Sequence, residues 1–342
     1  MRVALVCPYS WSVPGGVQTH VGGLAAALRG HGVEAEVLAP ADGRVDGVLP
    51  LGRTVPIPSN GSIQRVALSP AAIRRTAEAV RRGDYDLVHL HEPMLPAVGL
   101  AAIAAARAPL VGTFHMFRRE LLWYRVFRPV VRRAAARLAR RIAVSAAARD
   151  YVACTLAGDY AVIPNGIDYD ALARLDGHRS GGRILFVGRP EPRKGLTVLL
   201  EAFRRLGDGE LVLVGPTGDF GPRVRAFGRV TDAQLRGQLA AADVLCAPSL
   251  GGESFGLVLA EGMAAGLPIV ASAIPGYVDV LTPSWGRLVP PGNADALASA
   301  LGELLADDAL RRELGEAGRR EAARFAWPRV AEQVLEIYDS IN

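Results

Sequence analysis

The chain has 342 residues, 50% of them hydrophobic, and a formal net charge of +5 at pH 7. Because this length exceeds what one hydrophobic core usually supports, we expect two domains. The uncharged stretch at residues 262–278 is interrupted by glycines and prolines, which excludes a membrane-spanning helix there. We expect no signal peptide, because the N-terminus lacks a long apolar region followed by a small-residue cleavage site.

Positive charge is concentrated in the first half of the chain. Residues 1–170 contain 20 basic and 13 acidic side chains, whereas residues 171–342 contain 19 and 21. This asymmetry predicts an anionic partner: a phosphorylated substrate, a membrane surface or a nucleic acid. We expect no nucleic acid, because no recognised binding motif accompanies the charge. Cys7, Cys154 and Cys246 lie far apart in apolar runs, which predicts buried free thiols in a reducing cytoplasm.

Short apolar runs alternate with Ala-rich helical patterns along the chain. In the first half the runs are VALVCP, EAEVLAP, DLVHLHEP, PLVGTFH, RIAVS and YAVIP. After a weak pattern at residues 168–182 the series restarts with RILFVGR, ELVLVGP, DVLCAPS, LPIVASA and GRLVP. Such alternation predicts βα units and two parallel sheets.

The predicted fold class is therefore α/β, with two doubly wound Rossmann-like domains facing a central cleft. We place the domains at residues 1–170 and 171–326, followed by a C-terminal helix over residues 327–342, which Pro328 can begin. Ligands of such sheets bind beyond the carboxyl ends of the strands, so the chemistry is expected in strand-to-helix loops.

Two candidate positions lie in the loops of the first domain. In VPGGVQTH, the Gly15-Gly16 turn precedes a helix whose N-terminal N–H groups can bind a phosphate, although the GxGxxG fingerprint is absent. His115 leaves the carboxyl end of a strand, where a histidine is either structural or catalytic. His89 and His91 share a strand face and could chelate a metal, but no third ligand with zinc-like spacing follows, which favours polar packing.

In the second domain, GGESFGLVLAEG predicts a helix from Ser254 to Ala265. Its first N–H groups, on Ser254, Phe255 and Gly256, would form a second anion site. Glu253 precedes this helix and Glu261 lies two turns inside it. Ionised carboxylates accept hydrogen bonds, so this pair suits the hydroxyl groups of a sugar or ribose.

Four segments together carry a resemblance that extends over essentially the whole chain. VPGGVQTH, VIPNGID, VGRPEPRKGL and GGESFGLVLAEGMAAG resemble the retaining GT-B glycosyltransferases of family 4. VCPYSWSVPGGVQTHV, VPIPSNGS, HLHEP and APSLGGESFG are most similar to the actinobacterial phosphatidylinositol α-mannosyltransferases. The resemblance implies a peripheral membrane hexosyltransferase that moves mannose from GDP-mannose to phosphatidylinositol and retains the anomeric configuration. It also implies that the C-terminal helix, residues 327–342, crosses back to the first domain.

The resemblance also implies roles for single residues. Gly16 approaches the donor β-phosphate, His115 contacts the transferred sugar, Arg189 and Lys194 hold the diphosphate, Glu253 binds sugar hydroxyls and Glu261 binds the ribose. Lys194 is the one lysine among 39 basic residues. A compact ammonium reaches a single phosphate oxygen in a crowded site, which explains a lysine where every other cation is arginine.

Two Asp-x-Asp segments imitate the metal-binding motif of the other large glycosyltransferase fold. Asp84–Asp86 leads into the amino end of a strand, away from the expected cleft, and Asp168–Asp170 opens the linker. We therefore expect no protein metal site and no tightly bound cofactor, with at most free Mg²⁺ accompanying the nucleotide-sugar.

The acceptor side departs from the subfamily pattern. In those mannosyltransferases a small hydroxyl residue and then a lysine follow the histidine, whereas this chain has Met116 and Glu120. Arg118 or Arg119 is the candidate substitute. Of the remaining acceptor positions, Tyr9 and Arg193 match and Ser12 does not.

Two arginine-rich segments predict contact with anionic lipid at the inner face of the plasma membrane. Arg74 and Arg81 are seven residues apart, as are Arg75 and Arg82, so all four lie on one helix face. Residues 118–141 add nine arginines interleaved with aromatic residues. The alternative is a solvated basic face in an arginine-biased chain.

Three other functions stay open. A family 4 transferase with a soluble acceptor, such as a phosphorylated sugar or inositol, is favoured by the altered HMFRRE segment. A catalytically silent nucleotide-sugar-binding protein is disfavoured because every donor-side position is present. A nonhydrolysing sugar-nucleotide epimerase shares the two-domain fold but fits RPEPRKGL and the glutamate spacing less well.

Overall fold

The structure, a computed structural model, describes residues 1–13, 15–43, 45–59, 62–116, 126–177 and 182–341. The chain divides into two compact units. Unit 1 comprises Met1–Gly166 and Trp327–Asn342, and unit 2 comprises Ile167–Ala326. The first division falls four residues before the expected position at 170, and the second falls at the expected position after residue 326.

The described part of unit 1 contains a seven-stranded sheet in the order β3-β2-β1-β6-β7-β8-β9, with all pairs parallel. Its strands are β1 (Arg2–Val6), β2 (Glu34–Ala39), β3 (Val48–Pro50), β6 (Leu87–His91), β7 (Leu110–Phe114), β8 (Arg140–Ala143) and β9 (Ala161–Val162). A separate antiparallel hairpin pairs β4 (Val55–Ser59) with β5 (Ser62–Val66). The predicted parallel sheet is confirmed.

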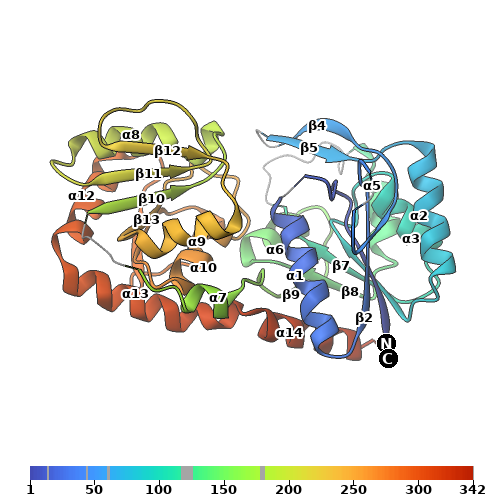
Figure 1. Cartoon of the computed structure of the whole chain (residues 1–342). Coiled ribbons are helices and arrows are strands. Elements are labelled where there is room, and N and C mark those ends of the chain that lie inside the picture. The colour runs from blue at the N-terminus through green and yellow to red at the C-terminus, as the bar shows by residue number, and fades with distance from the viewer. Residues whose placement is uncertain (14, 44, 60–61, 117–125, 178–181, 342) are drawn as a thin grey trace. The chain divides into compact units, whose positions relative to one another are not determined.

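Helices cover both faces of this sheet (Figure 1). Alternate strand residues point to opposite faces, so Val3 and Leu5 pack with α1 (Gly16–Gly30), whereas Ala4 and Val6 lie on the other face. The helices on that second face are α2 (Pro70–Arg82), α3 (Val98–Ala105), α5 (Arg128–Ala135) and α6 (Ala146–Ala153).

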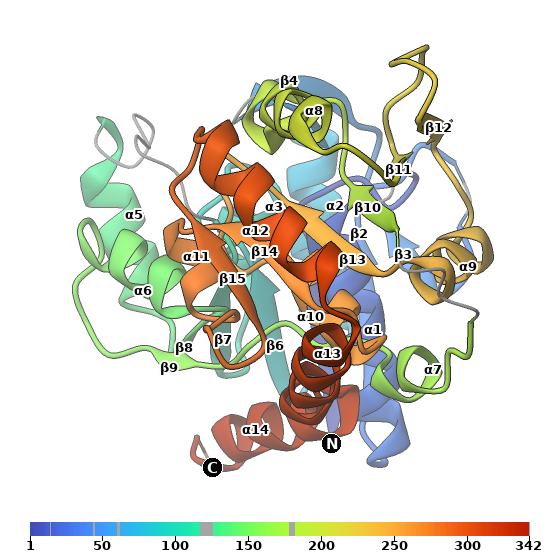
Figure 2. The same ribbon diagram turned by 90° about the vertical axis from the view of Figure 1, so that its left-hand side faces the viewer.

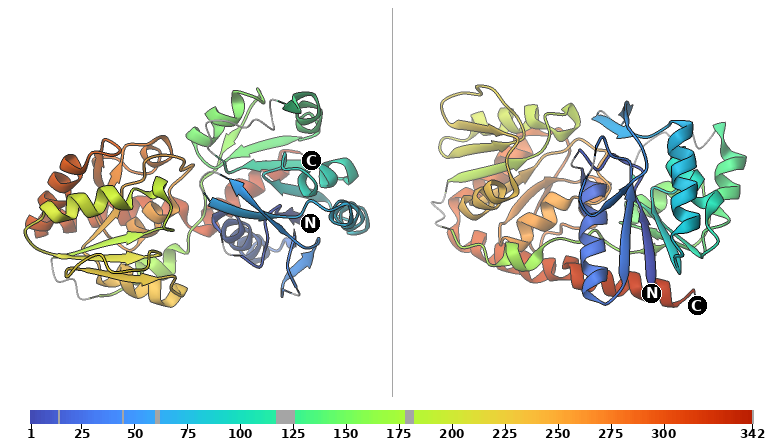
Figure 3. Two further views of the ribbon diagram at one scale, coloured as in Figure 1. Left: turned by 90° about the horizontal axis from the view of Figure 1, so that it is seen from above. Right: turned by 45° about the vertical axis from the view of Figure 1, so that its right-hand side comes forward.

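The C-terminal helix α14 (Trp327–Asp339) belongs to unit 1 and packs beside α1. The Trp327 ring fills the space left by Gly23 and Gly166, where a Cβ would collide with it. Tyr338 is fully buried, and its hydroxyl lies 2.7 Å from Nδ1 of His89. As a result the two chain ends lie close together in unit 1 (Figure 3).

The described part of unit 2 contains a six-stranded parallel sheet in the order β12-β11-β10-β13-β14-β15. Its strands are β10 (Arg183–Val187), β11 (Glu210–Val214), β12 (Val224–Gly228), β13 (Val244–Ala247), β14 (Ile269–Ser272) and β15 (Gly286–Val289). Helices α8 (Leu196–Arg205) and α12 (Ala294–Ala306) pack on one face, as Figure 2 shows for α12. The remaining helices of the unit are α7 (Tyr169–Ala173), α9 (Asp232–Ala241), α10 (Leu257–Ala264), α11 (Pro275–Val278) and α13 (Asp308–Ala322).

Two sequence expectations, one about the cysteines and one about the linker, need qualification. Cys7 and Cys246 are buried free thiols as predicted, but Cys154 is exposed because it follows α6 at the surface, and its Sγ bonds only to the Asp150 carbonyl oxygen. The weak pattern expected to be a linker contains α7, which Asp168 caps by accepting from the Ala171 N–H at 3.4 Å. Within the described ranges no helix is both long and apolar enough to cross a bilayer.

Candidate active site

The sheet of unit 2 has a switch point between β10 and β13, because connections leave these neighbours in opposite directions. Loops at such a point diverge and leave room for a ligand at the carboxyl ends of the strands. The loop after β10 contains Arg189 to Lys194, and the loop after β13 contains Glu253. The Leu250 N–H donates to the Arg193 carbonyl oxygen at 2.7 Å, which holds the two loops together.

Five charged side chains of these loops form one network. Glu191 pairs with Nε of Arg189 at 3.0 Å and with Arg193 at 2.8 Å. Oε1 of Glu253 accepts from Arg193 at 2.5 Å and lies 2.7 Å from Nζ of Lys194. Three cations therefore face two carboxylates, which leaves a net positive charge.

The exposure of these cations differs. The Arg189 side chain is 61% exposed, whereas that of Lys194 is 17% exposed and that of Glu253 is 15% exposed. Fixed cations that are partly withdrawn from water stabilise developing negative charge more strongly than solvated ones. The structure thus brings Arg189, Arg193, Lys194 and Glu253 together in one group, which we call the cation cluster.

The backbone beside the cation cluster is fixed by close approaches. Gly195 has a φ of 72°, and its missing side chain lets the Pro248 carbonyl oxygen pack against its Cα. Gly256 has a φ of 91°, and a Cβ there would lie 2.8 Å from the Tyr277 ring. The hydroxyl of Tyr277 in turn lies 2.9 Å from Oγ of Ser249.

The conformation of Gly256 corrects the predicted helix. Because a left-handed residue cannot belong to a right-handed helix, α10 begins at Leu257 and ends at Ala264. Ser254, Phe255 and Gly256 therefore precede the helix instead of supplying its first N–H groups. Phe255 is buried and its ring packs at 89° against Phe325, with the centroids 5.3 Å apart.

Glu261 lies in the second turn of α10 and is half-buried. Burial, with a smaller contribution from the charge of Asp232, raises the pKa of Glu261 to about 7. The enclosure of this carboxyl group is thus partial. In its ionised form both carboxylate oxygens accept hydrogen bonds, and a hydroxyl donor would favour that form.

In unit 1 the corresponding switch point lies between β1 and β6. Gly16 is exposed at the first turn of α1, as predicted. The loop before it is held by Nε2 of Gln18, which donates to the carbonyl oxygens of Ser10 and Val13 at 3.0 Å each. Tyr9 is 5% exposed and packs in the core with α1, so its acceptor role stays a prediction that would need its ring edge to become accessible.

His115 directly follows β7 and is 6% exposed. Its backbone N–H donates to Oε1 of Glu92 at 2.5 Å, and its Nε2 lies 2.9 Å from Nδ1 of His91. Burial raises the pKa of Glu92 to about 7 and lowers that of His115 well below its usual range. His115 is therefore a neutral imidazole that can donate or accept a hydrogen bond.

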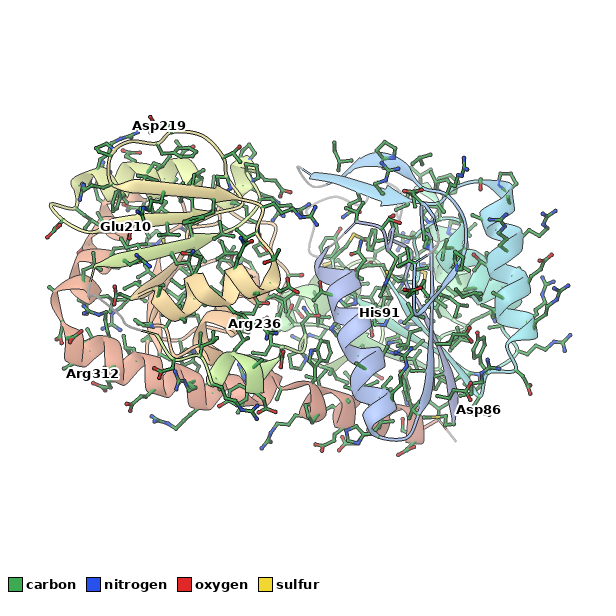
Figure 4. The ribbon with its side chains drawn as sticks, in the orientation of Figure 1. Asp86, His91, Glu210, Asp219, Arg236 and Arg312 are labelled. Carbon is green, nitrogen blue, oxygen red and sulfur yellow. The ribbon has the colours of Figure 1, made fainter. Side chains whose placement is uncertain are left out.

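Sequence reasoning missed one member of this group, His20 of α1. His89 is satisfied by Tyr338 and Thr113, as polar packing predicted. The spacing of His89 and His91 did not indicate that His91 meets His20 and His115, whose ring nitrogens lie within 4.8 Å of one another and of the His91 ring nitrogen. Spacing along the chain could not reveal this, since the three histidines come from three different elements. Figure 4 places His91 beside α1.

Both Asp-x-Asp segments have structural partners. Oδ2 of Asp86 accepts from the Arg2 N–H at 2.6 Å at the amino end of β6, the end opposite His91 (Figure 4). Oδ2 of Asp168 accepts from Arg236 at 2.8 Å.

The basic helix is as predicted. Arg74, Arg75, Arg81 and Arg82 are exposed on α2, opposite its buried Ala72, Thr76 and Val80. Arg118, Arg119, Glu120, Trp123 and Tyr124 lie outside the described residues.

The comparisons with known proteins agree with this geometry. The model described as Glycosyltransferase Family 4 matches residues 14–171, and the model described as Glycosyl transferases group 1 matches residues 181–307. Phosphatidyl-myo-inositol mannosyltransferase of Mycolicibacterium smegmatis is 42% identical across 100% of this chain and 94% of that protein. The protein of the same name from Mycobacterium leprae is 41% identical across 100% and 97%. Sucrose-phosphate synthase of Thermosynechococcus elongatus superposes with a TM-score of 0.76 at 25% identity, over 99% of this chain and 98% of that one.

The two Rossmann-like units, the superposition and the relatives together place the protein among the glycosyltransferases of the GT-B fold. The chain belongs to glycosyltransferase family 4.

Proposed function

We propose that the protein transfers mannose from GDP-mannose to phosphatidylinositol, with retention of the anomeric configuration. The observation that carries this proposal is the end-to-end similarity, at 41–42% identity, to proteins named phosphatidyl-myo-inositol mannosyltransferase. The cation cluster supports the donor half, because a nucleotide-sugar must leave as a diphosphate that requires neutralisation.

In this proposal unit 2 binds the donor. Arg189 and Lys194 hold the diphosphate, while Gly16 of unit 1 approaches the β-phosphate with its backbone. The cluster is preorganised, because Glu253 already holds Lys194 at 2.7 Å. When the donor binds, a phosphate oxygen would replace part of the contact between Glu253 and Lys194. The carboxylate oxygens of Glu253 would then accept hydrogen bonds from sugar hydroxyls. Ionised Glu261 would accept from the ribose diol.

The transfer step exchanges two bonds at the anomeric carbon. The bond from that carbon to the diphosphate oxygen breaks, and a bond to the acceptor oxygen forms on the same face. The acceptor proton passes to the departing phosphate oxygen. His115 contacts the transferred sugar as a neutral imidazole, since burial lowers its pKa. No protein metal ion takes part in this scheme, and free Mg²⁺ enters only with the donor.

Phosphatidylinositol is the proposed acceptor, with Tyr9, Arg118 and Arg193 as acceptor-side residues. The exposed arginines of α2 would hold the protein peripherally on anionic lipid at the cytoplasmic face of the membrane. A soluble phosphorylated acceptor is the second candidate, favoured by Met116 and Glu120 in place of the hydroxyl and lysine residues of the subfamily pattern.

The test is a transfer assay with purified protein and GDP-mannose, UDP-glucose or UDP-N-acetylglucosamine, each with phosphatidylinositol vesicles, with soluble inositol phosphate, with both or with neither. We expect mannosylated lipid from GDP-mannose alone. Lys194→Met protein, purified in parallel, excludes a contaminating activity. Mannosylation of inositol phosphate with unmodified lipid would support the soluble acceptor, and no transfer from any donor would overturn the proposal.

A further inference from the structure

We propose that His20, His91 and His115 form a buried site for one zinc-class divalent ion in unit 1. The three side chains are 4%, 1% and 6% exposed, and one ring nitrogen from each lies within 4.8 Å of the others. All three lie within unit 1, on α1, β6 and the end of β7. A site of this kind is independent of how the two units are arranged.

The geometry is close to what a metal requires. Nδ1 of His91 and Nε2 of His115 are 2.9 Å apart and share a hydrogen bond. Zinc–nitrogen bonds of about 2.0–2.1 Å in a tetrahedral site separate two ligand nitrogens by about 3.3 Å. Replacing the shared proton by a metal ion therefore needs a movement of about 0.4 Å. The ring nitrogen of His20, which lies within 4.8 Å of the others, must move by up to about 1.5 Å.

One unpartnered nitrogen supports a ligand at this site. Within the described part of the chain, Nδ1 of His20 is buried and has no hydrogen-bond partner. A buried polar atom without a partner costs free energy, and each imidazole becomes a metal ligand only when neutral.

The chemistry of the ligands selects the ion. Imidazole nitrogens suit Zn²⁺, Ni²⁺, Cu²⁺ and Co²⁺, whereas Mg²⁺ and Mn²⁺ prefer oxygen ligands. Three protein ligands leave a fourth position for water. The carboxyl group of Glu92, whose Oε1 accepts from the His115 N–H, lies next to the site and would balance part of the positive charge.

The metal ion would bind the side chain of His115, the residue that contacts the transferred sugar in the proposed function. Zinc should then inhibit transfer reversibly, and this consequence rests on that proposed role. Binding of the ion does not depend on it. A chain that binds zinc but lacks mannosyl transfer would therefore contradict the proposed function and leave the metal site intact.

The test is titration of chelator-treated protein with Co²⁺, followed by its visible d–d absorption, and with Zn²⁺ by calorimetry. We expect one ion per chain, with Zn²⁺ displacing Co²⁺. His20→Gln should weaken binding by roughly 100-fold or more, because loss of an outer partner alone costs 10–100-fold. His31→Gln, at an exposed histidine of the loop after α1, is the matched control and should bind normally.

His20→Gln is the most informative variant for this test. Its Nδ1 has no partner among the described residues, so the substitution strands no hydrogen-bonding group, and thermal unfolding without metal should match the wild type. Absence of stoichiometric zinc binding at micromolar concentration would overturn the site. Equal binding by wild type and His20→Gln would overturn it as well.

Discussion

Unit 1 and unit 2 both place polar residues at the carboxyl ends of parallel strands, but in opposite electrostatic states. In unit 1, His20, His89, His91 and His115 are buried beside one another, and burial holds them neutral. In unit 2 each partly buried cation of the cation cluster has a carboxylate within 3.0 Å. Burial thus disfavours the charged form of the unit 1 histidines, whereas the cations of unit 2 are accompanied by carboxylates.

The largest expected effect is on the charged cluster. Lys194→Met should lower kcat for mannosyl transfer by about 10²–10³-fold, the usual cost of removing one fixed group that stabilises developing charge. Arg236→Met removes an exposed cation of the same unit, paired with Asp168, and should leave kcat unchanged. Steady-state kinetics with GDP-mannose measure both. Near-wild-type turnover in Lys194→Met would show that charge in unit 2 is not what drives the reaction.

The neutral cluster should make unit 1 sensitive to acid. The four histidines bind protons in the unfolded chain below their usual pKa of 6.5 but not in the folded unit, so stability is lost as pH falls below 6.5. Glu92 acts in the opposite direction, because its folded pKa of about 7 exceeds its usual 4.5. With four groups against one, unit 1 should lose about 3 kcal/mol between pH 7 and pH 5.5.

Unit 2 should respond in the other direction. The pKa of Glu261 is raised to about 7, so protonation below that pH favours the folded state. Hydrogen exchange by mass spectrometry, corrected for intrinsic rates, separates peptides of β6 and β7 from peptides of β10 and β13. We expect faster opening at pH 5.5 than at pH 7 in unit 1 alone. Equal destabilisation of both units would contradict the opposite pH responses expected for them.

A smaller effect is expected where the backbone supports the cation cluster. Gly256→Ala forces a side chain onto a φ of 91° and against the Tyr277 ring, which should cost unit 2 about 1–3 kcal/mol. Gly237→Ala is the control, because a Cβ there meets nothing within 4 Å and the glycine lies in α9. Denaturant unfolding measures both, and an unchanged midpoint for Gly256→Ala would show that the loop can relax.

The smallest effect concerns the basic face of α2. Arg75→Gln should weaken binding to phosphatidylinositol vesicles at low salt by about 1 kcal/mol, roughly fivefold. Arg312→Gln, an exposed arginine of α13 in unit 2, should not change it. Flotation with sedimentation controls measures the partition. Equal loss for both variants would indicate general charge attraction, and no binding by the wild type would remove the membrane proposal.

The long apolar strands were predictable because a buried parallel strand is a short, continuous hydrophobic run. The predicted runs at β1, β2, β6, β7, β8 and β9, and at β10, β11, β13, β14 and β15, are all strands in the structure. The strands β3, β4, β5 and β12 were missed. Pro56 and Pro58 interrupt the hairpin strand β4, and in β12, at a sheet edge, Arg225 interrupts the apolar run.

The site was predictable only where its residues are close in sequence. RPEPRKGL and GGESFG carried their own signals, but the contact of Glu253 with both Arg193 and Lys194 depends on β10 and β13 being neighbours. His20 offered no local signal, because its meeting with His91 and His115 results from α1 packing on that face of the sheet. The tertiary fold brings His20, His91 and His115 together, and their spacing along the chain gives no sign of this contact.

The most direct test of the account is a competition in one reaction vessel. Labelled GDP-mannose is supplied with phosphatidylinositol vesicles and an equal concentration of soluble inositol phosphate, and the label is counted in the lipid and aqueous fractions. The account predicts label in the lipid, and none there with Lys194→Met. Label confined to a mannosylated soluble product would contradict phosphatidylinositol as the acceptor.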